Sequence, residues 1–103
     1  MSNILIRIKR AVLTRRIGFT NKARAEMKAD GLTEDDVVEA ILNAVAIYKT
    51  VRSRSPLREH SRERLYVILG TNLRGLPIYT KGKLVSKAGV ETYYFLISSK
   101  RSL

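Results

Sequence analysis

The sequence predicts an α+β fold in which N-terminal helices pack on one face of a four-stranded antiparallel sheet. Apolar residues recur at helical spacing as far as Asn43, and beyond it they alternate with polar residues as in strands. Helices followed by a run of strands favour this layered arrangement. The 103 residues, 1–103, are enough for a single domain, and no linker divides them.

Three helices are expected in the N-terminal half. Residues 4–14 carry apolar side chains at three- and four-residue spacing, which predicts a helix, although the isoleucines at their start also alternate as in a strand. A second helix follows Thr20, a suitable N-cap, and ends at Gly31, which suits the left-handed position after a helix. A third begins at Thr33, because Asp36 three residues later resembles a capping box. Its predicted buried stripe comprises Val37, Val38, Ile41, Leu42 and Val45.

Four strands are expected after the third helix. The stretches 71–75 and 86–89 have turn chemistry and separate the last three strands. Pro77 lies near the start of one strand, where it indicates either an edge position or a strand beginning. The strands are predicted over residues 46–53, 64–70, 76–85 and 90–99.

Residue usage excludes several classes of protein. There is no cysteine and a single histidine, so disulfide frameworks and nearly every zinc site are excluded, and we expect no cofactor or metal. No apolar run is long enough to span a membrane. Basic residues interrupt the apolar N-terminal stretch, which has no signal-peptide cleavage pattern, so we expect a cytoplasmic protein.

The charge predicts a polyanionic partner. The formal net charge is +11, and the sequence pI is about 10.5. Acids cluster between Asp30 and Ala46, whereas bases far outnumber acids from Ile47 onward. A basic membrane-surface protein would carry an amphipathic helix with bulky apolar anchors, which is a weaker fit. The alternative is a solvated cationic surface without a specific target.

An arginine-rich stretch lies between the first two predicted strands. Guanidinium groups bind phosphates through two hydrogen bonds and stack on bases of single-stranded RNA. The alternative is a polar loop without a target. His60 lies in this stretch, and histidine titrates near neutral pH, so it is either a candidate general acid or base or simply exposed. The candidate RNA-binding arginines are Arg52, Arg54, Arg58, Arg62 and Arg64.

Tyr79, Lys81 and Lys83 alternate along the third predicted strand and therefore share one face of the sheet. A row of one tyrosine and two lysines is suited to stack on bases and to bind phosphates. The alternative is that lysines on an edge strand oppose aggregation.

Short motifs on three predicted strands resemble those of a known family. The stretch Ile47-Tyr48-Lys49-Thr50 is similar to an aromatic-Tyr-Lys-Ser/Thr pattern of the MqsR-type toxins of bacterial toxin–antitoxin modules, which belong with the RelE-like small ribonucleases. Tyr79, in a hydrophobic-Tyr-x-Lys setting, resembles the family's strand tyrosine. Lys100, after a serine-containing stretch, resembles the lysine that closes its last strand. The resemblance extends over most of the chain from about Ile4.

The resemblance implies a RelE-like fold and a metal-independent mRNA endoribonuclease, or mRNA interferase. In such enzymes the ribose 2′-hydroxyl attacks the adjacent phosphate and basic residues stabilise the charge. Lys49, Tyr79 and Lys100 would form the catalytic set. A glutamine of the family, between its first two strands, has no clear match, and Arg58 and His60 fall in that region. The implied partners are single-stranded mRNA and an acidic cognate antitoxin protein.

Two other functions fit the same residues. The first is a non-catalytic RNA- or DNA-binding module, whose affinity falls with salt without strand cleavage. The second is a protein-interaction subunit whose basic face docks an acidic partner, in which case RNA would not compete with that partner.

Overall fold

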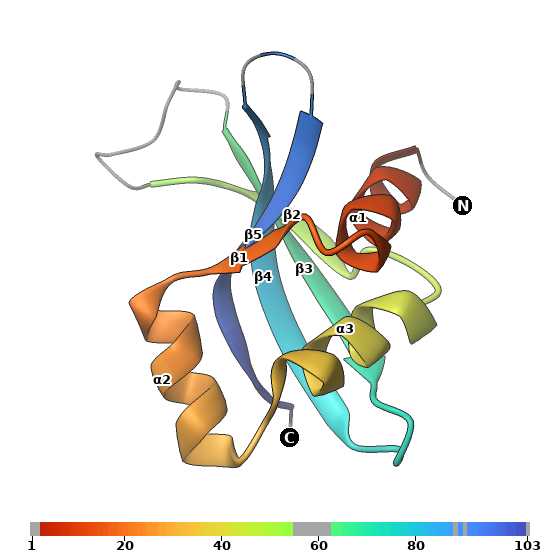
Figure 1. The fold of residues 1–103 in the computed structure, drawn as a ribbon, viewed down its shortest axis with the longest axis vertical. Coiled ribbons are helices and arrows are strands. Elements are labelled where there is room, and N and C mark those ends of the chain that lie inside the picture. Colours follow the sequence, from red (N-terminus) through yellow and green to blue (C-terminus); the bar gives the residue numbers. More distant parts are fainter. Residues whose placement is uncertain (1–2, 55–62, 88, 90, 103) are drawn as a thin grey trace.

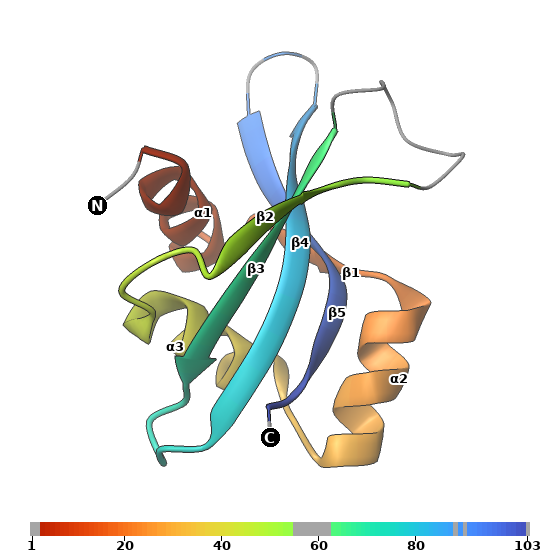
Figure 2. The same cartoon turned by 180° about the vertical axis from the view of Figure 1, so that it is seen from behind.

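A computed structural model describes residues 3–54, 63–87, 89 and 91–102 of the protein. Within these ranges the chain forms three helices on one face of a five-stranded sheet, with strand order β1-β5-β4-β3-β2 (Figure 1). Seen from behind, no helix covers the opposite face, which is called the open face below (Figure 2). The elements are α1 (Asn3–Leu13), β1 (Ile17–Phe19), α2 (Asn21–Asp30), α3 (Glu34–Asn43), β2 (Lys49–Arg52), β3 (Arg64–Thr71), β4 (Pro77–Lys87) and β5 (Glu91–Arg101).

The α+β class is confirmed, but the prediction of four antiparallel strands is wrong. The additional strand, β1, lies between two helices and pairs in parallel with β5, from Ile17 opposite Tyr94 to Phe19 opposite Leu96. Backbone hydrogen bonds of 2.9 Å at both ends extend this pairing. A three-residue strand is too short to show an alternating pattern, so its partner, and not its own sequence, defines it.

The helix boundaries follow from local capping. The Thr20 side chain accepts a hydrogen bond from the Ala23 backbone, and Gly31 ends α2 with φ of 69°. The capping box at Thr33 and Asp36 is present in full. The predicted stripe of α3 is wrong at Val45, because the chain becomes extended at the helix end and leaves Val45 86% exposed. None of the helices in the described ranges has the length and apolarity needed to cross a bilayer.

The strands alternate as predicted but differ in extent. Strand β2 is shorter than the expected 46–53, whereas β4 continues to Lys87 and takes up part of the expected turn. Pro77 begins β4, opposite Thr71, but β4 lies between β3 and β5. The edge alternative for Pro77, and with it the edge role of the lysines on β4, is therefore wrong.

The core lies between the helices and the covered face of the sheet. Ile68, Ile78 and Leu96 from the strands join apolar residues of all three helices in a buried cluster. Strand β3 and helix α3 approach so closely that a Cβ added at Gly70 would lie 2.0 Å from the backbone oxygen of Ala40. Glycine is therefore required where α3 crosses the sheet.

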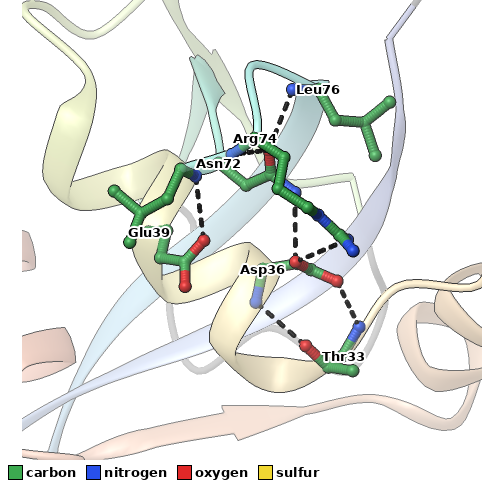
Figure 3. A network of polar contacts seen from close by, with 7 residues as sticks. Thr33, Asp36, Glu39, Asn72, Arg74 and Leu76 are labelled. Atoms are coloured by element: carbon green, nitrogen blue, oxygen red, sulfur yellow. Dashed lines mark hydrogen bonds and ion pairs between the residues drawn. The ribbon is translucent and has the colours of Figure 1, made fainter.

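A buried polar network joins the start of α3 to the turn between β3 and β4 (Figure 3). The Asp36 carboxylate accepts hydrogen bonds from the Thr33 backbone (2.9 Å) and the Asn72 amide (3.0 Å), and pairs with Arg74 (3.3 Å). The hydrogen bonds from Thr33 and Asn72, with the charge of Arg74, hold the pKa of Asp36 below its ordinary value despite burial. Asn72 also accepts from the Leu76 backbone, so the network fixes the start of β4.

A second polar contact ties α2 to the end of β5. The Glu26 carboxylate accepts hydrogen bonds from the Ser98 hydroxyl (2.8 Å) and the Ser99 backbone (3.1 Å), and pairs with Lys22 (3.0 Å). Burial raises the pKa of Glu26, but these hydrogen bonds and Lys22 outweigh it, so that the pKa is lowered. This contact lies beside an irregularity in the β4–β5 pairing at Lys81 and Gly82, and it positions the strand end that carries Lys100.

Candidate nucleic-acid interface

The open face carries a row of cations from neighbouring strands. Lys49 on β2 is opposite Val67 on β3, which in turn is opposite Lys81 on β4. Directly opposed residues project to the same face, and two strand spacings separate the lysine backbones by about 10 Å. In the next row, Tyr79 is opposite Lys100 on β5. Four predicted site residues that are distant in the sequence thus lie on one face of the sheet. They are Lys49, Tyr79, Lys81 and Lys100.

Tyr79 and Lys100 are in direct contact. The Lys100 ammonium lies 5.3 Å from the centroid of the Tyr79 ring, within the range of a cation–π interaction. On the same strand as Tyr79, Ile78 and Thr80 project to the helices and are 0% and 1% exposed. The buried neighbours anchor β4, so the tyrosine and the lysine are presented by a fixed strand pair.

Among the described residues, most cations of the open face have no carboxylate partner. The exception is Lys83, which pairs with the largely buried Glu63 at 3.2 Å. Like charges gathered without counter-charges attract a polyanion. Within residues 3–54, 63–87, 89 and 91–102, no ion pair is formed by Lys49, Arg52, Arg54, Lys81 or Lys100.

A hollow of about 480 Å³ lies beside Lys81, and it is called the β2–β4 hollow below. Strand β2 crosses in front of β3 and β4 in Figure 2, and residues at its end line the hollow together with Lys81 of β4. Two of the lining residues, Val51 and Leu65, are opposite each other on β2 and β3. The hollow is lined by Val51, Arg52, Arg54, Leu65 and Lys81.

Sequence reasoning singled out the cations of this hollow but not its apolar residues. Leu65 and Val67 are 8% and 1% exposed on a face that no helix covers. The signal was present in the sequence, because β3 carries apolar residues on both of its faces, and a strand open to solvent on one side normally does not.

Sequence reasoning also overlooked an aromatic residue of the open face. Phe95 on β5 is opposite Lys83 and is 36% exposed. A Cβ added at Gly18 of β1 would lie 2.9 Å from the Phe95 ring, so glycine leaves room for the ring at this position. No sequence signal separates Phe95 from the other strand-forming aromatic residues.

The remaining predicted site residues are not brought into this arrangement. Arg64 is opposite Arg52 at the ends of their strands, so both share the alternation of Tyr66, away from Tyr79. Arg52 nevertheless lines the β2–β4 hollow beside Lys81, whereas Arg64 is not among the lining residues. Arg58, His60 and Arg62 lie outside the described residues. Among the residues that are described, no group of three or more His, Cys, Asp or Glu side chains is arranged to hold a metal ion.

Comparison with protein-family models, with curated proteins and with solved structures gave no match to this chain. The geometry of the open face and the motif resemblance at Lys49, Tyr79 and Lys100 therefore carry the functional proposal.

Proposed function

We propose that this protein is a metal-independent endoribonuclease that cleaves mRNA, an MqsR/RelE-like toxin of a type II toxin–antitoxin pair. The observation that supports this most is the gathering, on one sheet face beside the Tyr79–Lys100 contact, of cations that form no ion pair with the described residues. The motif resemblance supplies the reaction type, and the open face supplies the groups that such a reaction needs.

RNA binds across the open face through its phosphates. Five cations contact phosphates in this proposal, and each contact releases counterions from the RNA. For a single strand, the logarithm of the binding constant then falls against the logarithm of salt concentration with a slope of about −3.5. The contacting residues are Lys49, Arg52, Arg54, Lys81 and Lys100.

Cleavage is a transesterification within the RNA. The 2′-oxygen forms a new bond to the adjacent phosphorus while the bond from phosphorus to the 5′-oxygen breaks. The proton lost by the 2′-hydroxyl is balanced by the proton gained by the 5′-oxygen. Lys100 and Lys49 stabilise the charge that develops on the phosphate oxygens, and the Tyr79 hydroxyl donates a hydrogen bond to it. Donors aimed at such developing charge each contribute a rate factor of about 10² to 10³.

The resemblance also supplies a partner and a location. A free ribonuclease of this charge would degrade the mRNA of its own cell, so an acidic antitoxin protein neutralises it. Because mRNA is the substrate, we place the protein in the cytoplasm.

The test is cleavage of a long single-stranded RNA in EDTA, with both product ends mapped. We expect discrete fragments that end in a 2′,3′-cyclic phosphate and begin with a 5′-hydroxyl. The triple substitution Lys49→Ala, Tyr79→Ala and Lys100→Ala is expected to reduce the rate at least about a hundredfold while the far-ultraviolet circular dichroism is retained. Lys28→Ala removes an exposed cation of α2 and serves as the control, with wild-type cleavage expected. Wild-type cleavage by the triple variant would contradict the assignment.

A second candidate is a non-catalytic nucleic-acid-binding module. The exposed Phe95 on the cationic face favours it, because an aromatic ring among lysines stacks on bases without any chemistry. Intact RNA that is nevertheless bound with the expected salt slope would establish this candidate and make Lys49, Tyr79 and Lys100 contact residues. Binding of an acidic protein partner that RNA fails to displace would instead establish the protein-interaction subunit.

A further inference from the structure

We propose that the β2–β4 hollow is a subsite for one unstacked base of the bound RNA, and that it sets the sequence preference next to the cleaved bond. The inference rests on the proposed function of the open face. The hollow combines an apolar surface with a cationic rim, and a nucleotide offers a partner to both.

The lining of the hollow matches the two parts of a nucleotide. Val51 and Leu65 offer an apolar surface that suits the flat face of a base. Arg52 and Arg54 supply guanidinium planes, which stack on bases and bind phosphates. The volume of about 480 Å³ lies within the range of small-molecule sites, roughly 300 to 1,000 Å³. A bare phosphate would leave the apolar surface without a partner.

A second hollow provides a comparison within the same molecule. It has a similar volume, about 430 Å³, and it lies between α1, the chain that follows α3, and the strands β2 and β3. Lys49 is its single cationic lining residue among those described. Volume therefore does not distinguish the two hollows, but the cationic rim does. The second hollow is lined by Ile4, Leu5, Val45, Ala46, Ile47, Lys49, Thr50 and Tyr66.

Lys81 joins the hollow to the cleavage site. It lines the hollow, and it lies two residues from Tyr79 on the same face of β4, a separation of about 7 Å along the strand. Tyr79 in turn contacts Lys100. A base held in the hollow therefore belongs to a nucleotide adjacent or nearly adjacent to the scissile phosphate. The base must be unpaired and unstacked to enter, which restricts the substrate to single-stranded RNA.

The test measures the contribution of each base to binding. A short fluorescent RNA centred on the mapped cleavage site, or on the tightest binder from a random pool, carries 2′-O-methyl groups that prevent cleavage. One base at a time is replaced by an abasic sugar, and affinity is measured by fluorescence anisotropy in EDTA. For the wild-type protein we expect one position at which base removal lowers affinity about tenfold, because the stacking of that base on the protein is lost.

Two matched substitutions then locate that base. Val51→Phe fills the β2–β4 hollow without changing the charge, and Val45→Phe makes the same change in the second hollow. We expect Val51→Phe to bind intact RNA about tenfold more weakly, to abolish the abasic effect, and to keep the salt slope. Val45→Phe is expected to behave as the wild type.

The outcomes separate this inference from the proposed function. If wild-type protein binds and cleaves RNA but shows no sensitive position, or if Val51→Phe keeps the full abasic effect, the subsite is overturned and the ribonuclease proposal stands. If the wild-type protein neither binds nor cleaves RNA, both proposals fail. The abasic series on the wild-type protein remains decisive even if Val51→Phe does not fold.

Discussion

The two faces of this sheet are built from alternate residues of the same strands, yet they differ in almost every physical respect. Toward the helices, side chains such as Ile68 and Ile78 are buried in one continuous apolar cluster. Away from the helices, Lys49, Lys81 and Lys100 gather without an ion pair to any described residue. The covered face provides the stability that lets the open face carry mutually repelling charges. Substitutions on the two faces should therefore separate cleanly, with stability affected on one and binding on the other.

The largest expected loss of stability comes from a substitution that disrupts the packing of α3 on the covered face. Gly70→Ala places a methyl group against the backbone oxygen of Ala40, which cannot move without displacing α3. We expect a loss of about 3 kcal/mol in the free energy of unfolding, measured by urea denaturation. Gly18→Ala is the control, because its new methyl group meets the Phe95 ring, a side chain able to turn away. Equal losses for the two variants would show that α3 does not pack as closely as the structure indicates.

The next effect concerns the polar network of the covered face. Asp36→Asn removes a carboxylate that accepts three contacts, and we expect a loss of about 2 kcal/mol at neutral pH. Asp35→Asn makes the same change one residue earlier, at an exposed side chain that pairs with the exposed Arg15, and should lose less than about 0.5 kcal/mol. Urea unfolding at pH 7 compares the two variants. A larger loss in the free energy of unfolding for Asp35→Asn than for Asp36→Asn would show that the polar network around Asp36 does not stabilise the fold.

The pKa of Asp36 gives this prediction a pH dependence. Because the folded-state pKa is lowered, the carboxylate contributes stability that is fully present well above the ordinary value of 3.8 and is lost as the pH falls through that value toward the folded pKa. The wild-type protein should therefore lose more stability than Asp36→Asn between about pH 5 and pH 2. Glu26, whose pKa is also lowered, contributes in the same direction to both proteins, so only their difference reports on Asp36.

The smallest effect on stability, and a clear one on binding, is expected on the open face. Lys81→Ala should change the free energy of unfolding by less than about 0.5 kcal/mol, since the lysine makes no ion pair among the described residues. The same substitution should reduce the salt slope of RNA binding by about 0.7. Anisotropy titrations over a range of salt concentrations measure it, with Lys28→Ala leaving the slope unchanged. A destabilised Lys81→Ala protein would show that the two faces are not independent.

Features that depend on neighbouring residues were predicted from the sequence better than features that depend on distant ones. Thr20, Gly31 and the Thr33–Asp36 box act through neighbours within three or four residues, so the sequence alone was sufficient to place the helix ends. Strand β1 was missed because its pairing depends on residues of β5 that are distant in the chain. Val45 was placed in the core because the helical period continued past the point where the chain turns away.

The candidate site, like the fold, could be predicted from the sequence only in part. Residue type and alternation were sufficient to nominate Lys49, Tyr79, Lys81 and Lys100, which the structure brings to one face. The β2–β4 hollow was not foreseen, because it depends on how β2 crosses the sheet, and that is a property of twist between strands and not of any single segment.

Strand β5 is made after every other described element, yet it lies inside the sheet between β1 and β4. Thr20, at the start of α2, donates a hydrogen bond to a residue 77 positions later in the chain. During synthesis β1 and α2 must therefore wait without their main partner until β5 emerges, and contacts of such long range are slow to form. Among the cations of the proposed RNA surface, Lys100 is the one that β5 carries, so it joins Tyr79 only at this late step. The hollow between β2 and β4 needs no residue of β5, and the Tyr79–Lys100 contact is therefore the last part of the surface to form.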